Sequence, residues 1–189
     1  MRSLLKAVTK LVGCTVAGFV GVTMLASAAH ADGIASYRNQ GSSYYNSAGT
    51  LVYRYTSPAG ESVSNGSRLA LRKGVHASHF FFIFTSTGTP SEYRFQNYVT
   101  DWATSNADKA MLDVSGSGTA DGTWADHWQY NGGANQRWKY IDAGSGWYTL
   151  RPQHTSNRCL DRENANEGAQ LYIWTCNSTN PQKWQHYYW

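Results

Sequence analysis

The sequence has 189 residues and carries 16 Lys and Arg against 12 Asp and Glu, a formal net charge of +4. Three of these basic residues and no acidic ones lie in the first 31 positions, which leaves 13 against 12 in the remainder. A near-neutral remainder argues against a nucleic-acid partner, because such a partner requires a basic face. By length, the remainder is one domain that can bury a sizeable core.

The first predicted element is a secretory signal peptide at residues 1–31. A basic start precedes the apolar run LVGCTVAGFVGVTML, and ASAAHA follows it. A basic segment, an apolar run and an A-x-A site are typical of such a leader. We expect cleavage after Ala31, with Ala28 as the alternative. The alternative reading as a membrane anchor is disfavoured, because about 20 apolar residues are needed to span a bilayer. The sequence therefore predicts a secreted, extracellular protein with no membrane insertion after cleavage.

Residues 32–50, DGIASYRNQGSSYYNSAGT, are rich in Gly, Ser and Asn. We interpret them as an N-terminal extension that precedes any alignable strand. Beyond them, three segments of similar length cover about 51–97, 98–140 and 141–189. Self-similarity at a fixed period indicates a repeat architecture.

The second and third segments share the order of their motifs. The aligned pairs are Met111-Leu112-Asp113 with Cys159-Leu160-Asp161, DHWQY with YIWTC, and NQRW (135–138) with PQKW (181–184). The first segment keeps the hydrophobic pattern only. There EYRFQNY is expected to place Phe95 at the Trp position and Tyr93 at the Gln position, and the Asp position falls near Ala70.

The secondary structure is predicted to be all-β. Runs such as WYTLRP, RCLD, AQLYIWTC and KWQHYYW are short, β-branched and aromatic, and clusters of Gly, Asn, Ser and Asp separate them. Such runs predict strands with tight turns, about four per repeat. No long helical stripe is present. The sequence thus predicts three four-stranded repeats with pseudo-threefold symmetry.

Two cysteines remain once Cys14 leaves with the leader. In an exported protein, Cys159 and Cys176 indicate one disulfide, and two free buried thiols are the alternative. Met111 and Tyr130 occupy the corresponding positions of the second repeat. We therefore expect an apolar pair in place of the disulfide there.

The order Cys-Leu-Asp, x-x-Trp-x-Cys and Asn-Gln-x-Trp resembles that of the ricin B-type lectins and of related carbohydrate-binding modules in bacterial glycanases. Two repeats carry the resemblance, over residues 98–189. It implies a β-trefoil, that is, a six-stranded barrel capped by three hairpins with one potential sugar pocket per repeat. It also implies that Trp138 and Trp184 pack into the shared core.

The resemblance further implies sugar pockets in the second and third repeats. A neutral sugar needs a carboxylate to accept its hydroxyl protons, an amide, and an aromatic ring against its C–H face. The candidate carbohydrate-binding residues are Asp113, Asp126, Trp128, Asn135 and Gln136 in the second repeat, and Asp161, Tyr172, Trp174 and Gln182 in the third.

Some of these positions depart from the family pattern. Asp126 and Tyr172 stand where relatives commonly carry Gln, and Pro181 replaces the expected Asn, which Asn180 can supply only if the loop is shifted. Gln136 is expected to brace Asp113. The alternative is structural, because an Asp at a strand end is often a turn residue and a Trp in a β-protein is often a core residue.

The sequence therefore predicts a secreted, monomeric carbohydrate-binding protein without catalytic activity. Its expected partners are glycans or polysaccharides, with no cofactor and no metal. No metal-ligand set beyond one His-x-x-His and no G-x-S-x-G nucleophile motif is present. The alternative is a degenerate trefoil that binds a protein, as an inhibitor or a toxin-associated subunit does.

Overall fold

The computed structural model describes residues 33–45, 51–52, 54–58, 60, 62–73, 81–100 and 103–188. The predicted signal peptide lies outside these residues. Within the described ranges, no helix has the length and apolar character needed to cross a membrane.

Strands and short 3-10 turns make up the regular structure of the described chain. The main sheet contains β1 (Gly33–Asn39), β4 (Arg54–Pro58), β5 (Ser67–Lys73), β6 (Phe81–Ser86), β7 (Glu92–Asn97), β8 (Ala110–Val114), β9 (Thr123–Gln129), β10 (Trp138–Asp142), β11 (Tyr148–Pro152), β12 (Arg158–Arg162), β13 (Leu171–Thr175) and β14 (Trp184–Tyr188). β2 (Tyr44–Tyr45) and β3 (Leu51–Val52) form a separate hairpin. The 3-10 turns are η2 (Tyr98–Thr100), η3 (Asn106–Asp108), η4 (Ser115–Ser117), η5 (Ala134–Gln136) and η6 (Asn180–Gln182).

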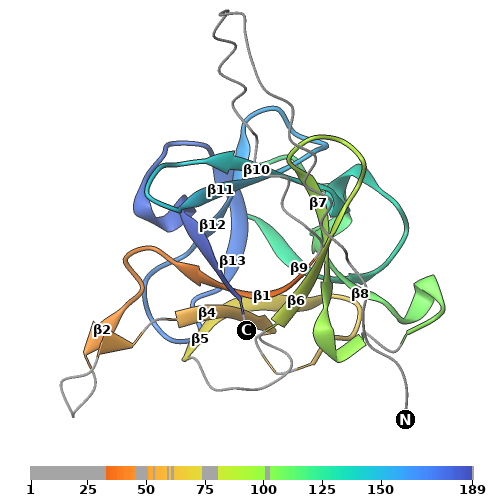
Figure 1. Cartoon of the computed structure of the whole chain (residues 1–189), viewed down its shortest axis with the longest axis horizontal. Helices are drawn as coiled ribbons and strands as arrows, with labels where there is room; N and C mark the ends of the chain where they lie inside the picture. The colour runs from red at the N-terminus through yellow and green to blue at the C-terminus, as the bar shows by residue number, and fades with distance from the viewer. Residues whose placement is uncertain are drawn as a thin grey trace, which may run out of the picture.

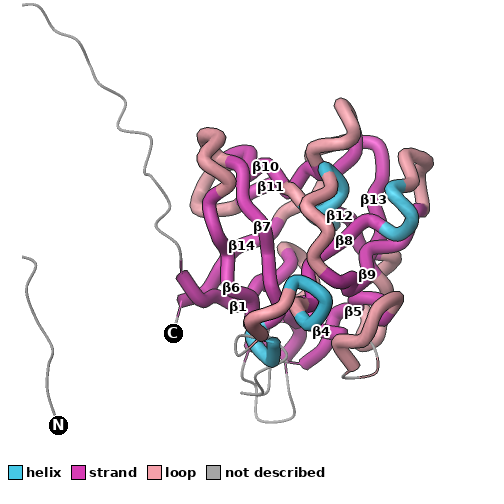
Figure 2. Tube along the Cα trace, turned by 90° about the vertical axis from the view of Figure 1, so that its right-hand side faces the viewer, coloured by secondary structure: helices cyan, strands magenta, loops and turns pink. Residues whose placement is uncertain are grey.

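Six of the described strands close into a barrel, in the order β1, β6, β7, β10, β11 and β14, with β14 paired back to β1. The hairpins β4–β5, β8–β9 and β12–β13 form a cap. Figure 1 looks onto this arrangement, and Figure 2 shows β1, β6, β7 and β14 on the left and β8, β9, β12 and β13 on the right. The predicted all-β trefoil with three four-stranded repeats is confirmed.

The interpretation of residues 32–50 as an extension that precedes any alignable strand is wrong. Residues 33–39 form β1, which pairs with β14 over five residues and with β6 over four. Ala35 and Tyr37 supply a small and an aromatic side chain to the barrel, and both are buried. The first repeat therefore starts at β1 rather than at residue 51.

The strand register also corrects the alignment of the first repeat. Phe82 in β6, and not Phe95, occupies the position of Trp138 and Trp184. The cross-strand partners are Pro152 and Tyr93 for Trp138, Asn39 and Tyr148 for Trp184, and Asn97 and Ala35 for Phe82. Phe95 instead lies in the middle of β7 and is buried.

The two tryptophans of the Gln-x-Trp motifs belong to the core, as expected. Trp138 and Trp184 are 0% and 1% exposed. Their indole N–H groups donate hydrogen bonds to the carbonyls of Leu112 (3.1 Å) and Leu160 (3.0 Å) on the cap hairpins. Each motif thus joins a barrel strand to the hairpin of its own repeat.

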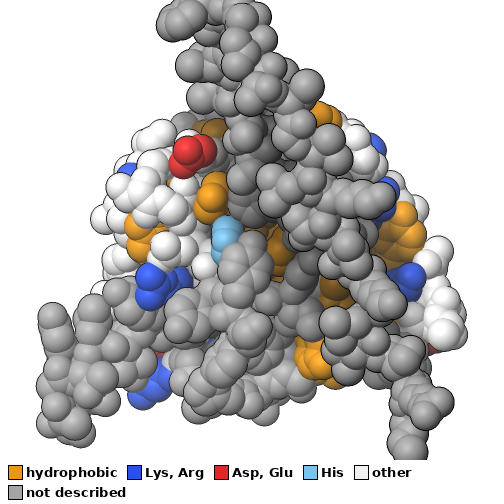
Figure 3. All heavy atoms as spheres, in the orientation of Figure 1, with side chains coloured by type: hydrophobic (Ala, Val, Ile, Leu, Met, Phe, Trp, Pro, Cys, Tyr) orange, Lys and Arg blue, Asp and Glu red, His pale blue; other side chains and the backbone are white. Residues whose placement is uncertain are grey.

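The face drawn in Figure 3 shows only scattered Lys and Arg side chains among its described atoms, near the rim. They form no continuous basic stripe there, which agrees with the near-neutral charge balance.

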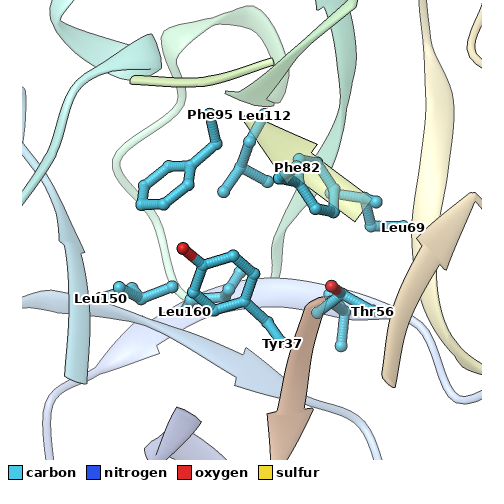
Figure 4. Close-up of a pocket in the computed structure, with 9 residues that line it drawn as sticks. Tyr37, Thr56, Leu69, Phe82, Phe95, Leu112, Leu150 and Leu160 are labelled. Atoms are coloured by element: carbon cyan, nitrogen blue, oxygen red, sulfur yellow. The ribbon is translucent and has the colours of Figure 1, made fainter. Parts of the chain in front are cut away.

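The hydrophobic core encloses a small apolar cavity of about 10 Å³. Side chains from all three repeats surround it, and Figure 4 shows Tyr37, Phe95 and Leu150 around the same space as Leu112 and Leu160. Each cap hairpin contributes one residue at an equivalent position to the lining of this cavity. These residues are Thr56, Leu112 and Leu160, so the first repeat places a hydroxyl where the other two place an aliphatic side chain.

Candidate functional site

The second repeat brings its predicted polar residues together at the β8–β9 hairpin. Asp113 and Asp126 lie opposite each other on the paired strands, and each is 3% exposed. The side-chain amide of Asn135, in η5, donates to both carboxylate oxygens of Asp113 at 2.9 Å and to the Val114 carbonyl at 3.2 Å. Oδ1 of Asp126 is buried and has no hydrogen-bond partner among the described residues. The site thus holds two buried carboxyls and one amide.

Burial of this carboxyl pair shifts both pKa values upward. Burial raises the pKa of Asp113 to about 7; the Asp126 carboxylate adds to the rise, while Gln136 and Asn135 oppose it through hydrogen bonds. Burial also raises the pKa of Asp126 to about 6, against a hydrogen bond from Ser115 and the positive charge of Arg68. Below about pH 7 the pair therefore holds a proton for an increasing share of the time, and one carboxyl can then donate a hydrogen bond while the other accepts.

The side chain of Gln136 mainly bonds to the backbone of the preceding loop, and we call such a residue a latch. Its side chain is fully buried, accepts from the Asn131 amide (3.0 Å) and donates to the Gln129 carbonyl (2.8 Å). Gln136 also contributes a hydrogen bond that lowers the pKa of Asp113, which is the bracing contact expected from the sequence. Gln136 is therefore placed to hold the site together rather than to meet a ligand.

The third repeat achieves the same arrangement with different partners. Gln182 donates directly to Oδ2 of Asp161 (2.8 Å), and the Arg162 amide donates to Oδ1 (2.6 Å). Gln182 also latches the loop by accepting from the Asn177 amide (2.8 Å) and donating to the Thr175 carbonyl (2.9 Å).

The Asn that Pro181 replaces in the third repeat is not substituted by its neighbour. Asn180 is exposed and makes no hydrogen bond to Asp161. The Pro181 carbonyl instead accepts from the Asn39 side chain (2.7 Å) of β1. Gln182 has therefore taken over the bracing that Asn135 provides in the second repeat.

Electrostatically, the third site is a single carboxylate next to a cation. Burial raises the pKa of Asp161, and the Gln182 side chain, the Arg162 amide and the Arg162 charge lower it. Tyr172, opposite Asp161 on β13, donates its hydroxyl to the Arg162 carbonyl (3.3 Å). Tyr172 thus lies where Asp126 lies in the second repeat, without adding a second carboxyl.

Each of the two sites carries one exposed tryptophan. Trp128 and Trp174 are 41% and 42% exposed, and Tyr98 at 37% is the other exposed large apolar residue among the described ones. The register pairs Trp128 with Met111 and Trp174 with Cys159, so both occupy the same position of their hairpins. Because side chains alternate along a strand, each indole lies on the same hairpin face as the Asp of its repeat.

The first repeat lacks this constellation in the structure as well. Ser57, and not Ala70, stands at the position of Asp113 and Asp161, and Ala70 faces it on β5. Arg72 takes the position of the exposed tryptophans, two residues beyond Ala70. With neither a carboxylate nor an aromatic ring at these two positions, this hairpin does not repeat the arrangement of the other two.

The predicted disulfide is confirmed. Cys159 and Cys176 are bonded, with their Cα atoms 5.1 Å apart. In the second repeat, Met111 and Tyr130 line a common hollow of about 180 Å³ instead.

One neighbour of the second site was not predicted from the sequence. The guanidinium of Arg68, from the first repeat, lies 4.3 Å from the centre of the Trp124 ring and stands opposite Asp126 across the β5–β9 pair. Trp124 in turn contacts Tyr172 edge to face at 6.2 Å. Only the register between different repeats brings these groups together, so motif spacing within one repeat gave no signal for them.

No group of three or more His, Cys, Asp or Glu that could hold a metal occurs in the described part of the chain. His127 is fully buried, stacks on Phe82 at 5.9 Å, and burial lowers its pKa to about 3. It is therefore a neutral core residue.

Comparisons with known proteins agree with the geometry. Residues 102–170 match the family described as "Ricin-type beta-trefoil lectin domain-like". No curated protein sequence matches the chain. Similar solved structures include the designed threefold symmetric protein ThreeFoil, at 24% identity and a TM-score of 0.68, over 82% of this chain and 98% of that one.

Two natural proteins show the same fold. An exo-β-1,3-galactanase from Clostridium thermocellum is 19% identical with a TM-score of 0.69, over 83% of this chain and 30% of that one. An agglutinin from Rhizoctonia solani is 13% identical with a TM-score of 0.60, over 82% and 94%. The chain thus spans less than a third of the galactanase and nearly all of the agglutinin. At these identities the likeness shows the fold alone.

Proposed function

We propose that this ricin-type trefoil is a secreted carbohydrate-binding protein without catalytic activity, which binds glycans through the second and third repeats. The observation that carries the proposal is the pair of exposed indoles, Trp128 and Trp174, at equivalent positions beside a buried Asp. An exposed indole offers a rigid apolar plate to the C–H face of a sugar at little entropic cost. A carboxylate next to it accepts sugar hydroxyls in strong, charge-assisted hydrogen bonds.

The burial of the carboxylates limits what each site can do. Asp113 and Asp161 are 3% and 5% exposed, so a sugar meets each of them at one edge only. A shallow contact of this kind is consistent with a weak single site, about −4 kcal/mol for a millimolar Kd. Two such sites on one rigid barrel bind a polymer more tightly by acting together. A polysaccharide is therefore the ligand class that the arrangement fits best.

The test is binding of a polysaccharide panel to Trp128→Ala, Trp174→Ala and the double variant. Because both indoles are exposed, the variants should remain folded, while each single change should weaken polymer binding by roughly tenfold through lost avidity. The matched control is Tyr98→Ala, which removes an equally exposed ring outside both sites. Unchanged affinity in the folded double variant would refute the proposal.

The alternative of a protein-binding trefoil rests on the departures Asp126 and Pro181. Its signature would be a parent protein that binds no glycan of the panel, together with a protein ligand whose affinity falls in the Trp128→Ala/Trp174→Ala double variant. Export is tested separately, by N-terminal sequencing of secreted protein, with residue 32 expected first and residue 29 as the alternative.

A further inference from the structure

A groove on the barrel wall lies outside both candidate sugar sites. It has a volume of about 530 Å³, within the range of ligand sites in proteins. Its lining residues are Lys139 of β10, Arg151 of β11, and Gln153, His154, Thr155 and Ser156 of the loop that follows β11. None of the residues assigned to the sugar sites is among them.

The groove concentrates positive charge. Lys139 and Arg151 stand directly opposite each other on paired strands, and like charges in this relation repel. Neither side chain has a carboxylate within ion-pair distance among the described residues. Glu92, which faces Lys139 from the other side, is 1% exposed; it accepts a hydrogen bond from Thr87 (2.7 Å) and lies 3.8 Å from Arg137. The acid opposite Lys139 therefore interacts with Thr87 and Arg137 instead.

The groove is also ordered before any ligand arrives. Arg151 donates through Nη1 to the Ser156 carbonyl at 2.8 Å, which fixes the guanidinium and leaves its other donors available. Nε2 of His154 lies 2.9 Å from the Gly118 carbonyl, which can only accept, so Nε2 carries the proton. Nδ1 of His154 is buried and has no hydrogen-bond partner in the described chain.

We propose that this groove binds an anionic group, a sulfate ester or a carboxylate, of an acidic polysaccharide. A fixed guanidinium, an ammonium and two hydroxyls suit a planar or tetrahedral oxyanion. No Phe, Tyr or Trp side chain lines the groove, so it lacks the large rings on which nucleic-acid bases stack. The choice of a polysaccharide rests on the proposed function, and the two exposed indoles would then bind other parts of the same chain.

The experiment compares dextran, dextran sulfate and polygalacturonate as probes for the parent and for Lys139→Gln/Arg151→Gln. The parent should bind at least one acidic polymer roughly tenfold more tightly than dextran, and the groove variant should lose most of that preference. The two acidic probes distinguish a sulfate from a carboxylate. A matched control is Arg94→Gln/Lys109→Gln, which removes the two cations of the 180 Å³ hollow and causes the same loss of charge.

The outcomes separate this inference from the proposed function. An equal loss in both double variants, or no loss in the groove variant, overturns the groove as a specific site. If no polymer binds the parent, the proposed function and the polysaccharide ligand both fail. Inorganic sulfate then decides whether the groove holds an oxyanion, since it should raise the Tm of the parent and of Arg94→Gln/Lys109→Gln more than that of Lys139→Gln/Arg151→Gln. An equal rise in all three, which the general stabilising effect of sulfate would give, overturns the groove.

Discussion

Replacing Asp126 with Asn should flatten the dependence of stability on pH. In the folded protein the pKa values of Asp113 and Asp126 are raised to about 7 and about 6 from 3.8. A carboxyl whose pKa is raised by folding binds more protons in the folded than in the unfolded state between the two values. Its stabilising contribution is therefore complete below about pH 4 and is lost as the pH rises through 6 to 7. Asp126→Asn removes one carboxyl of the pair and lowers the pKa of the other.

The magnitude follows from these values. A rise from 3.8 to about 7 corresponds to about 4 kcal/mol, at 1.36 kcal/mol per pH unit, for ionising Asp113 in the folded state. Each kcal/mol moves the Tm of a domain of this size by about 2–4 °C. Between pH 5 and pH 8, about two of these pH units act at Asp113 and about one at Asp126, which is again about 4 kcal/mol in total. The Tm of the parent should therefore fall by roughly 10 °C over this range, and that of Asp126→Asn by about two thirds of that or less, because only the Asp113 share remains.

The assay is thermal unfolding by circular dichroism across pH 5–8. Asp108→Asn, an exposed carboxylate outside the pair, serves as the control and should follow the parent. At pH 8 the Asp126→Asn variant should be the more stable protein. A variant with the same slope as the parent would show that the pair does not hold a proton and that the reasoning is wrong.

Other substitutions test the core and the latches. Thr56→Val should raise the stability by about 1 kcal/mol, measured by urea unfolding, because the Thr56 hydroxyl is buried without a partner among the described residues; a loss of stability would contradict this. Cys159→Ser/Cys176→Ser should cost about 3 kcal/mol for a loop with a separation of 17 residues, and an unchanged Tm in the double variant would count against it. Trp138→Phe should cost about 1–3 kcal/mol, because it removes the indole N–H that donates to the buried Leu112 carbonyl. Gln182→Leu should cost at least as much, because the Asn177 amide and the Thr175 carbonyl both lose the side chain that bonds to them. If either variant is as stable as the parent, its hydrogen bonds do not contribute to stability.

The fold was predictable because two repeats carry polar markers at matching positions. Asp113 and Asp161, with the Gln-x-Trp motifs, fix the strand order of the second and third repeats without structural information. The first repeat has no such marker, so its alignment rested on hydrophobicity, which is similar at Phe82 and Phe95. The backbone hydrogen bonds between strands determine which of the two phenylalanines aligns with Trp138 and Trp184. Residue types alone do not reveal this pairing where neighbouring positions are similarly apolar.

The candidate site was predictable in its residues but less so in their roles. Spacing placed the carboxylates beside the tryptophans, yet it could not reveal that Asp113 and Asp161 are buried, or that Asn135 donates to both oxygens of Asp113. It also could not show that Gln182 takes the role of Asn135, because a buried amide can reach a carboxylate from either of two adjacent loop positions. The groove at Lys139 was not predicted, since its residues become neighbours only through the β10–β11 pairing.

The seam between β1 and β14 bears on the order in which the chain can fold. These strands lie almost at opposite ends of the described residues. Until they pair, the barrel is an open sheet with two free edges. A contact so distant along the chain closes slowly, since a large loop must be ordered first. The cap hairpins, whose strands are neighbours in sequence, can form early, while the barrel remains an open sheet until β14 arrives. A circular permutant that joins residue 188 to residue 33 by a short linker and opens the chain at the exposed turn around Gly144 would make this seam local, and it should fold faster than the parent to the same structure.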